Sequence, residues 1–239
     1  MYRYQILVEY VGTKFVGWQK QLKGKSIQKE IENKLSKLLK QKIIIYGSGR
    51  TDAGVHAIEQ SAHFDIKLKI KEIKKLIKSL NFFLNPKKIS IINIYKRKQQ
   101  FHARHSAKER VYKYFIINRL AAPTLENERA WHIRKKLDIK LLKEGAKKLT
   151  GSHDFSTMRA KNCYAKSPIK KINKITIKNI DKKIQIEFRS KSFLRNQVRS
   201  MVGCLKYLAE NNIKSTKEFL GFEYDGFKWE KDHFAKKVD

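Results

Sequence analysis

Hydrophobic and polar residues alternate along several short segments of the chain, and a period of two residues is typical of β-strands. The segments are separated by polar stretches that contain turn-forming residues such as Gly and Asn. The chain is therefore expected to be rich in short strands. The pattern predicts strands over residues 2–10, 43–46, 58–66, 89–95 and 111–117, and a hairpin of strands 172–178 and 184–188.

Apolar residues recur at helical spacing in other segments. One helix is predicted to begin after Ser26, a favourable N-cap residue, with Ile27, Ile31 and Leu35 on its apolar face. Further helices are predicted over 73–84, before Pro86, over 141–149, and over 192–210. This mixture of elements predicts the α+β class. We divide the chain into an N-terminal α/β lobe, residues 1–104, and a C-terminal α/β lobe, residues 105–239.

The charge of the chain points to a polyanionic partner. Its 239 residues include 55 Lys and Arg against 22 Asp and Glu, a formal net charge of +33, and 41% are hydrophobic. That apolar content suffices for a core, so the charge belongs to a folded protein and not to a disordered tail. Solvated lysines can account for part of the excess, because they are spread along the chain without a dense block. The remainder favours nucleic acid as the partner.

Several classes of protein are excluded by simple counts. Apolar runs such as 43–46 fall far short of the roughly 20 residues that a membrane span needs. The N-terminus lacks the apolar block of a secretory signal, so we expect a cytoplasmic protein without a membrane partner. Cys163 and Cys204 make neither a disulfide framework nor a zinc site, and the seven histidines show no ligand spacing with them. We expect no metal.

Residues 47–57, Gly-Ser-Gly-Arg-Thr-Asp-Ala-Gly-Val-His-Ala, form the most informative segment. A phosphate-binding P-loop would end in Gly-Lys-Ser/Thr, and a dinucleotide fingerprint would have a third glycine at position 52, so neither fits. The segment instead exposes an acid, Asp52, on a glycine-rich loop with Arg50 two positions away. From these residues alone, Asp52 is either a catalytic carboxylate or an Asx-turn residue that supports a glycine corner.

The same segment is similar to the signature of the tRNA pseudouridine synthase A family, Gly-x-Gly-Arg-Thr-Asp-x-Gly-Val-His-Ala. On this resemblance Asp52 is the catalytic aspartate, Arg50 the loop arginine, Tyr112 the active-site tyrosine and Arg199 the arginine that partners the aspartate. The resemblance covers about residues 1–205. Other matching pieces, in the order of the family, are Gly17-Trp18-Gln19 with Gln28, Phe101-His102-Ala103-Arg104, Tyr112-x-Tyr114, Asp154-Phe155-Ser156, Ser167-Pro168-Ile169 and Phe193-Leu194 through Arg199 to Gly203.

The resemblance implies an enzyme that isomerises uridine to pseudouridine in tRNA at positions 38–40 of the anticodon arm. It also implies a homodimer whose subunits have two α/β lobes around a central mixed, mostly antiparallel sheet, with an RNA-binding cleft between them. The reaction rejoins uracil to the same ribose through C5 and consumes nothing, so we expect no cofactor. Asp52 either forms a covalent adduct or assists by removing a proton, and the sequence leaves both open.

Residue chemistry suggests roles and leaves alternatives. Tyr112 offers a flat face for the extruded base, or is a core aromatic residue of its strand. Arg50 can fill the space that the base vacates. Arg199 favours the ionised aspartate, or is an exposed helix residue, and Arg195 is expected one helical turn earlier. A basic strip for RNA contact, or else a solvated loop, is formed by His102, Arg104, His105 and Lys108 beside Phe101.

Two other functions compete with catalysis: a non-catalytic RNA-binding protein and a basic structural protein of the ribosome. A pure binder gains nothing from Asp52, because an acid weakens the attraction of phosphates. A ribosomal structural protein would show long unfolded tails. The family usually closes with an Ala-Pro-Ala-x-x-Gly-Leu segment. In this chain the last proline is Pro168, and the corresponding C-terminal region contains Gly221–Trp229, which does not match that segment.

Overall fold

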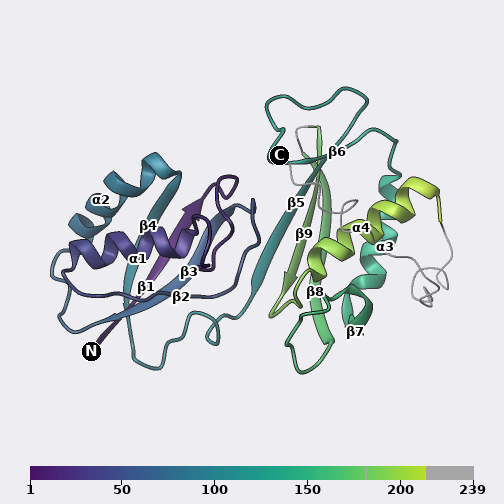
Figure 1. Cartoon of the computed structure of the whole chain (residues 1–239). Coiled ribbons are helices and arrows are strands. Elements are labelled where there is room, and N and C mark those ends of the chain that lie inside the picture. The colour runs from purple at the N-terminus through teal and green to yellow at the C-terminus, as the bar shows by residue number, and fades with distance from the viewer. Residues whose placement is uncertain (181, 214–239) are drawn as a thin grey trace. The chain divides into compact units, whose positions relative to one another are not determined.

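The structure is a computed structural model, and it describes residues 1–180 and 182–213. The atypical closing segment, Gly221–Trp229, lies outside the described residues. The chain separates into two compact units, Met1–Ala107 and Lys108–Asp239, each with its own sheet and core (Figure 1). We describe each unit by itself.

The first unit is an antiparallel four-stranded sheet with two helices packed on one face (Figure 1). Its strand order is β2-β3-β1-β4. In β1 the buried residues Tyr4, Ile6, Val8 and Tyr10 alternate with more exposed ones, as the two-residue period predicts. The elements are β1 (Tyr2–Tyr10), α1 (Ile27–Leu38), β2 (Tyr46–Gly47), β3 (Ala57–Ile66), α2 (Ile73–Leu84) and β4 (Ile89–Arg97).

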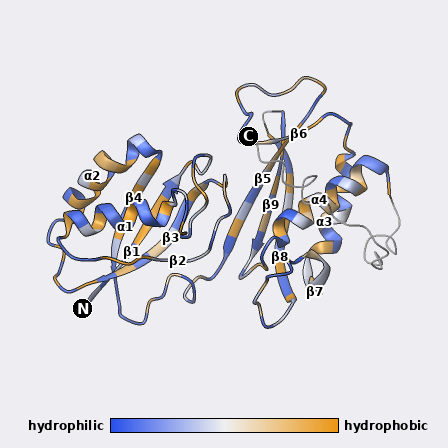
Figure 2. Ribbon diagram, in the orientation of Figure 1, coloured by the Kyte–Doolittle hydropathy of each residue, from blue (hydrophilic) through white to orange (hydrophobic). Residues whose placement is uncertain are grey.

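Local chemistry sets the helix boundaries in this unit. The backbone N–H of Lys29 donates to the side chain of Ser26 (3.3 Å), so the predicted N-cap of α1 is confirmed. Helix α2 ends at Leu84, and Pro86 lies in the short 3₁₀ turn that follows it. Hydrophobic residues of both helices belong to the core that they share with the sheet, and Figure 2 shows hydrophobic and hydrophilic residues mixed along both helices.

The strand predicted over 43–46 was wrong in its extent, because β2 covers only Tyr46 and Gly47. Ile43 and Ile45 are buried, but their N–H groups donate to side chains of α1 instead of to another strand. Ser36 Oγ accepts from Ile43 N (2.9 Å) and Glu32 Oε1 accepts from Ile45 N (3.0 Å). A helix therefore supplies the hydrogen bonds that a sheet would otherwise provide.

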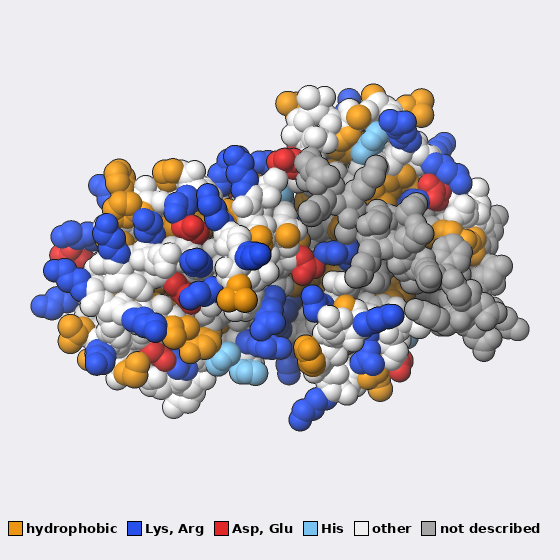
Figure 3. All heavy atoms as spheres, in the orientation of Figure 1, with side chains coloured by type: hydrophobic (Ala, Val, Ile, Leu, Met, Phe, Trp, Pro, Cys, Tyr) orange, Lys and Arg blue, Asp and Glu red, His pale blue; other side chains and the backbone are white. Residues whose placement is uncertain are grey.

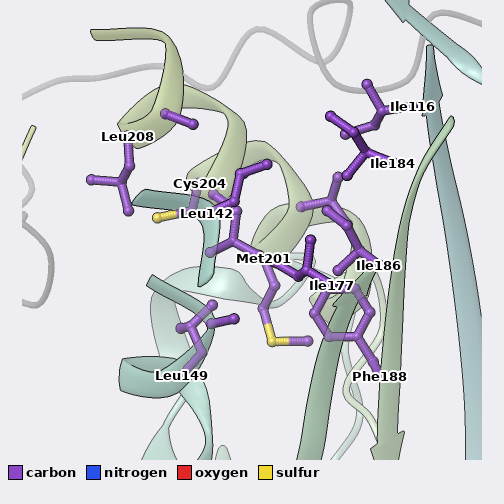
Figure 4. Close-up of a cluster of buried hydrophobic side chains, with 14 of the residues drawn as sticks. Ile116, Leu142, Leu149, Ile177, Ile184, Ile186, Phe188, Met201, Cys204 and Leu208 are labelled. Carbon is purple, nitrogen blue, oxygen red and sulfur yellow. The ribbon is translucent and has the colours of Figure 1, made fainter. Parts of the chain in front are cut away.

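The second unit is a five-stranded sheet in the order β6-β5-β9-β8-β7, with α3 and α4 packed against it. Strands β5 and β6 run parallel, and the other pairs are antiparallel. Phe188 and Ile186 on β9 meet Met201 and Leu142 on the helices in its core (Figure 4). The elements are β5 (Arg110–Asn118), β6 (Trp131–Ile133), α3 (Ile139–Leu149), β7 (Gly151–Asp154), β8 (Ile169–Ile180), β9 (Lys183–Ser190) and α4 (Gln197–Asn211).

The helix predicted over 192–210 begins later than expected. Asn196 has a left-handed backbone (φ 67°), which the right-handed helix cannot contain, so α4 starts at Gln197. The buried side chain of Gln197 accepts from Leu194 N (2.8 Å) and fixes this start. The short strands β6 and β7 were not predicted.

The described elements confirm the α+β class, and the strands are divided between two sheets, one in each unit. The RNA-binding cleft expected from the resemblance stays a prediction. Within the described ranges 1–180 and 182–213, no helix combines the length and apolar character needed to cross a membrane.

Candidate active-site loop and RNA-contact residues

Asp52 lies in the loop that joins β2 to β3, with its side chain exposed. Arg50 is exposed on the same loop. Backbone hydrogen bonds hold the loop on both sides of the aspartate: Trp18 N–H donates to the carbonyl of Thr51 (3.1 Å), and Gly54 N–H donates to that of Phe15 (3.3 Å). An exposed carboxylate on a fixed backbone is suited to act on a bound molecule.

Two further contacts stiffen the same loop. Val55 N–H donates to the carbonyl of Asp52 (3.3 Å), which closes a turn around the aspartate. The hydroxyl oxygens of Tyr10 and Thr51 lie 2.8 Å apart in a hydrogen bond, so the loop is also tied to β1. The position of Asp52 is therefore set by the core of the first unit.

Glycines allow residues 12–18 to approach the loop this closely. Gly17 has a φ of +105°, and a Cβ built on it would lie 2.4 Å from the carbonyl oxygen of Thr51. A Cβ on Gly12 would lie 2.0 Å from the carbonyl oxygen of Val55. No real side chain tolerates such distances, so both positions require glycine. This explains physically why the Gly17-Trp18 piece accompanies the aspartate loop.

A buried polar network on α1 connects the two chain segments that lead to the site. Gln28 Oε1 accepts from Gln19 Nε2 and from Lys20 N (both 2.9 Å). Gln28 Nε2 donates to Glu32 Oε1 (3.0 Å) and to the carbonyl of Ile45 (3.1 Å). The role of Glu32 was not predicted. The feature of the sequence that could have revealed this role is the position of Glu32, an acidic residue one helical turn after Gln28 and beside the apolar face of the helix.

His56 supports the loop through its ring. Its Nδ1 accepts a hydrogen bond from Gly12 N (3.2 Å). This bond adds a third link between the 12–18 segment and the loop of Asp52. Among the described residues, no group of three or more His, Cys, Asp or Glu is arranged to hold a metal ion.

His102 and His105 lie in an ordered group of rings in the first unit. Ring centroids are 4.4 Å apart for His102 and His105, 4.6 Å for His63 and His102, and 5.2 Å for Tyr46 and His63. Phe101 meets His63 edge-on at 6.1 Å. We call Tyr46, His63, Phe101, His102 and His105 the ring cluster. The sequence did not reveal Tyr46 and His63 as members, because the rings that they contact lie 17 to 56 positions away along the chain.

The two central histidines of the cluster favour the neutral state. The pKa of His63 is lowered to about 4, mainly by burial and also by the nearby His102 and Arg3, while Asp65 acts in the opposite direction. Its Nδ1 accepts from Ala103 N (3.2 Å), which a ring protonated at that nitrogen cannot do. Burial also lowers the pKa of His102, and the positive charges of His105, Arg3 and Arg104 act in the same direction.

Arg3 fixes the segment that carries the cluster. Its Nε and Nη2 bind the two carboxylate oxygens of Asp65 (2.8 and 2.7 Å), a two-pronged pair that lowers the pKa of Asp65. Its Nη1 donates to the carbonyls of Gln99 (2.6 Å) and Phe101 (2.8 Å). The segment before Arg104 is thus held on the sheet face opposite the helices.

Figure 3 shows that Lys and Arg side chains are spread over the visible face, in agreement with the absence of a dense basic block in the sequence. The same view shows histidine side chains at the surface beside them. Arg104 and His105 are both exposed, and they lie together at the end of the segment that Arg3 holds. Lys108 is also exposed and is the first residue of the second unit.

In the second unit, Tyr112 is partly buried on β5 and meets Phe193 edge-on, with ring centroids 5.2 Å apart. Arg199 lies in the first turn of α4 and is partly buried. Burial raises the pKa of Tyr114, and the nearby positive charge of Arg199 opposes that shift.

Arg195 is exposed and precedes α4, so the prediction that it lies one turn earlier on the same helix was wrong. The cause is the left-handed backbone of Asn196.

Comparisons with known proteins agree with these features. The family model for tRNA pseudouridine synthase matches residues 6–106 and 146–219. A protein named tRNA pseudouridine synthase A from Pelagibacter ubique is 62% identical over 229 residues, which cover 92% of this chain and 93% of that relative. Proteins of the same name from Anaplasma phagocytophilum (43% identical; 84% of this chain, 82% of the relative) and Ehrlichia canis (41%; 91% and 90%) are also similar. The chain therefore belongs to the tRNA pseudouridine synthase family.

Proposed function

We propose that this protein isomerises uridine to pseudouridine at positions 38–40 of the anticodon arm of tRNA, with Asp52 as the catalytic carboxylate and without a cofactor. Its family membership makes it an isomerase that acts on tRNA uridine. The observation that carries the assignment of Asp52 is the loop itself, which keeps the full family signature and holds an exposed acid between two backbone anchors.

The reaction sets the demands on the site. The bond from N1 of uracil to C1′ breaks, C5 joins C1′ of the same ribose, the C5 proton is lost and N1 gains a proton. A carboxylate serves this sequence either as a nucleophile at C1′ or as a base, and both roles need the ionised form. Because a stacked uracil is inaccessible, the nucleotide must leave the helix at a cost of about a few kcal/mol. An exposed Asp52 suits a substrate that is extruded in this way.

Other residues receive proposed roles from the family resemblance and their chemistry. We propose Tyr112 and Arg199 as further catalytic residues of the second unit, Tyr112 as a face for the base and Arg199 as a cation that favours an ionised carboxylate. Arg50 is proposed to occupy the space that the extruded base leaves. Arg195 and Lys108 are proposed to contact the RNA backbone, because both are exposed cations.

The proposal extends to assembly and location. We propose that the protein acts as a homodimer in the cytoplasm and binds tRNA largely through its net charge of +33. Light scattering after size-exclusion chromatography measures the mass directly. A mass of one chain at working concentration would contradict the dimer without touching the assignment of Asp52.

The decisive experiment is tritium release from tRNA labelled at C5 of uridine. Wild-type protein should release the label, and mapping should find pseudouridine at positions 38–40. Asp52→Asn keeps the shape of the side chain, so it should bind tRNA within about twofold of wild type and release no label. Retention of the label by wild-type protein that binds tRNA would refute the activity, and normal turnover by the variant would refute the role of Asp52.

A further inference from the structure

The ring cluster is not used by the chemistry proposed for Asp52, yet its rings form a continuous series of contacts in the first unit. Three of its members, His63, His102 and His105, follow one another at ring distances of 4.6 and 4.4 Å, and Tyr46 stacks on His63 with an angle of 26° between the rings. His63 is only 2% exposed, whereas Tyr46 is 50% exposed. The cluster thus has a buried centre and two exposed ends, Tyr46 and His105.

We propose that Tyr46 and His105 form a stacking platform for an unpaired base of the RNA, next to the uridine that is modified. This inference rests on the proposed function, since it takes tRNA as the substrate. It adds a binding site and assigns its ligand, the flat face of a nucleobase. It also changes the role of His102 from a surface contact to a support for the exposed rings.

The chemistry of the cluster favours a base over a phosphate. Aromatic faces bind bases by stacking, and this is a common way in which proteins hold single-stranded RNA. His102 already accepts a hydrogen bond from Arg104 N at its Nδ1 (3.2 Å), so that nitrogen is not available to donate to a phosphate. The exposed cation Arg104, next in sequence to the cluster, is suited to hold the phosphate that accompanies a stacked base.

The platform has a fixed connection to the catalytic loop. Tyr46 pairs with His63 in the sheet, and Ser48 N–H donates to the carbonyl of Ser61 (2.8 Å) just after it. Gln60 Nε2 then donates to the carbonyl of Gly49 (2.7 Å). Asp52 follows Tyr46 by six residues, which span at most about 20 Å even when fully extended. A single RNA loop can therefore reach both.

A stacking site at this place answers a physical need of the reaction. Extruding a uridine separates it from its neighbours in the loop and removes their stacking. A protein ring that stacks on a neighbouring base compensates part of that loss. Tyr46 packs on His63, whose ring is fixed by the bond from Ala103 N, and His105 packs on His102, so little conformational entropy should be lost when the base binds.

The test measures binding of an anticodon stem-loop RNA by fluorescence anisotropy at several salt concentrations. Tyr46→Ala should weaken binding about tenfold, and Tyr46→Phe should stay within twofold of wild type, since stacking needs the ring and not the hydroxyl. The slope of log K against log salt should be unchanged for both. Arg104→Ala should instead reduce the slope by about 0.7 to 0.9, because it removes a phosphate contact.

Phe82→Ala provides the matched control. Phe82 is 76% exposed on α2 and touches Phe83, so its loss removes an exposed aromatic ring outside the cluster. It should bind the RNA as wild type does. His105→Ala gives a second variant of the platform at an exposed position, in case Tyr46→Ala disturbs the sheet edge, and should weaken binding severalfold.

A base analogue reports stacking directly. The RNA carries 2-aminopurine in turn at each unpaired position of the loop, and its fluorescence is quenched when it stacks on an aromatic ring. Asp52→Asn protein with the ring cluster intact should quench one position beside the target uridine, and the same protein with Tyr46→Ala should not. Unchanged binding by both Tyr46→Ala and His105→Ala, or a weaker salt slope in them, would overturn the platform. Every protein in these measurements carries Asp52→Asn, including the reference with which the variants are compared, so a failure of the proposed catalysis leaves the outcome unaffected.

Discussion

Protonation of His63 should destabilise the first unit as the pH falls. The side chain is 2% exposed and its pKa lies at about 4 in the folded protein, against 6.5 for an ordinary histidine. The unfolded chain therefore takes up a proton near pH 6.5, whereas the folded chain takes it up only near pH 4. Stability from the neutral ring is present above pH 6.5 and is lost as the pH falls towards 4.

The size of the effect follows from the two pKa values. A difference of about 2.5 corresponds to about 3 kcal/mol at 1.36 kcal/mol for each pKa unit, and about 2.5 kcal/mol of this is already lost at pH 4.5. His63→Gln removes the titration but keeps an oxygen that can accept from Ala103 N. The variant should therefore lose less stability than wild type between pH 7.5 and 4.5, and the difference should approach about 2.5 kcal/mol.

Urea unfolding at the two pH values measures this difference. Trp18 is buried in the first unit, so its fluorescence reports on that unit when Trp131 and Trp229 are replaced by Phe in both proteins. Carboxylates that titrate in the same range affect both proteins equally and cancel in the comparison. A parallel loss of stability in the two proteins, within about 0.5 kcal/mol, would refute a buried neutral His63.

Two further changes test the packing around the active-site loop. Gly17→Ala places a Cβ 2.4 Å from the Thr51 carbonyl oxygen at a positive φ, so it should lower the free energy of unfolding by at least about 2 kcal/mol and remove most of the turnover. Gly54→Ala is the control, because Gly54 has a φ of +80° but a Cβ there meets nothing within 4 Å, and it should cost about 1 kcal/mol. Urea unfolding measures the stability of both variants, and tritium release measures their turnover. Glu32→Ala removes the oxygen that accepts from both Ile45 N and Gln28 Nε2, so it should lower the free energy of unfolding by about 1–3 kcal/mol. Glu32→Gln keeps an oxygen that can accept and should cost less. Equal losses for the two variants in urea unfolding would show that this acceptor is unimportant.

The elements that the sequence predicted well are those whose pattern is set by one buried face. The alternation in β1, the cap at Ser26 and the β8–β9 hairpin follow from local chemistry, and the structure confirms them. Residues 43–45 are as apolar as a strand, but their backbone partners are side chains on a helix. Periodicity contains no information about such a partner.

The residues of the candidate site likewise divide into those that the local sequence reveals and those that depend on distant partners. The loop of Asp52 was recognisable because its residues are contiguous in the sequence. His63 was not, since it occupies an outward position of β3 that a two-residue period predicts to be exposed. The segment around Ala103, forty residues away, covers it. Burial of a polar residue by a distant segment depends on tertiary structure and leaves no local signal.

Charge alone does not explain how such a basic protein selects one uridine. Most of its 55 cations are lysines, which attract any phosphate and carry no positional information. Among the arginines, Arg3 forms an ion pair with Asp65, and Arg189 forms ion pairs with Glu187 and Glu109. Selection must then depend on ordered groups near Asp52, so Tyr46→Ala should spread modification over neighbouring uridines more than a change of any single exposed lysine, such as Lys143→Ala. Mapping pseudouridines at equal tRNA occupancy measures this, and an unchanged distribution in Tyr46→Ala would show that other groups position the RNA.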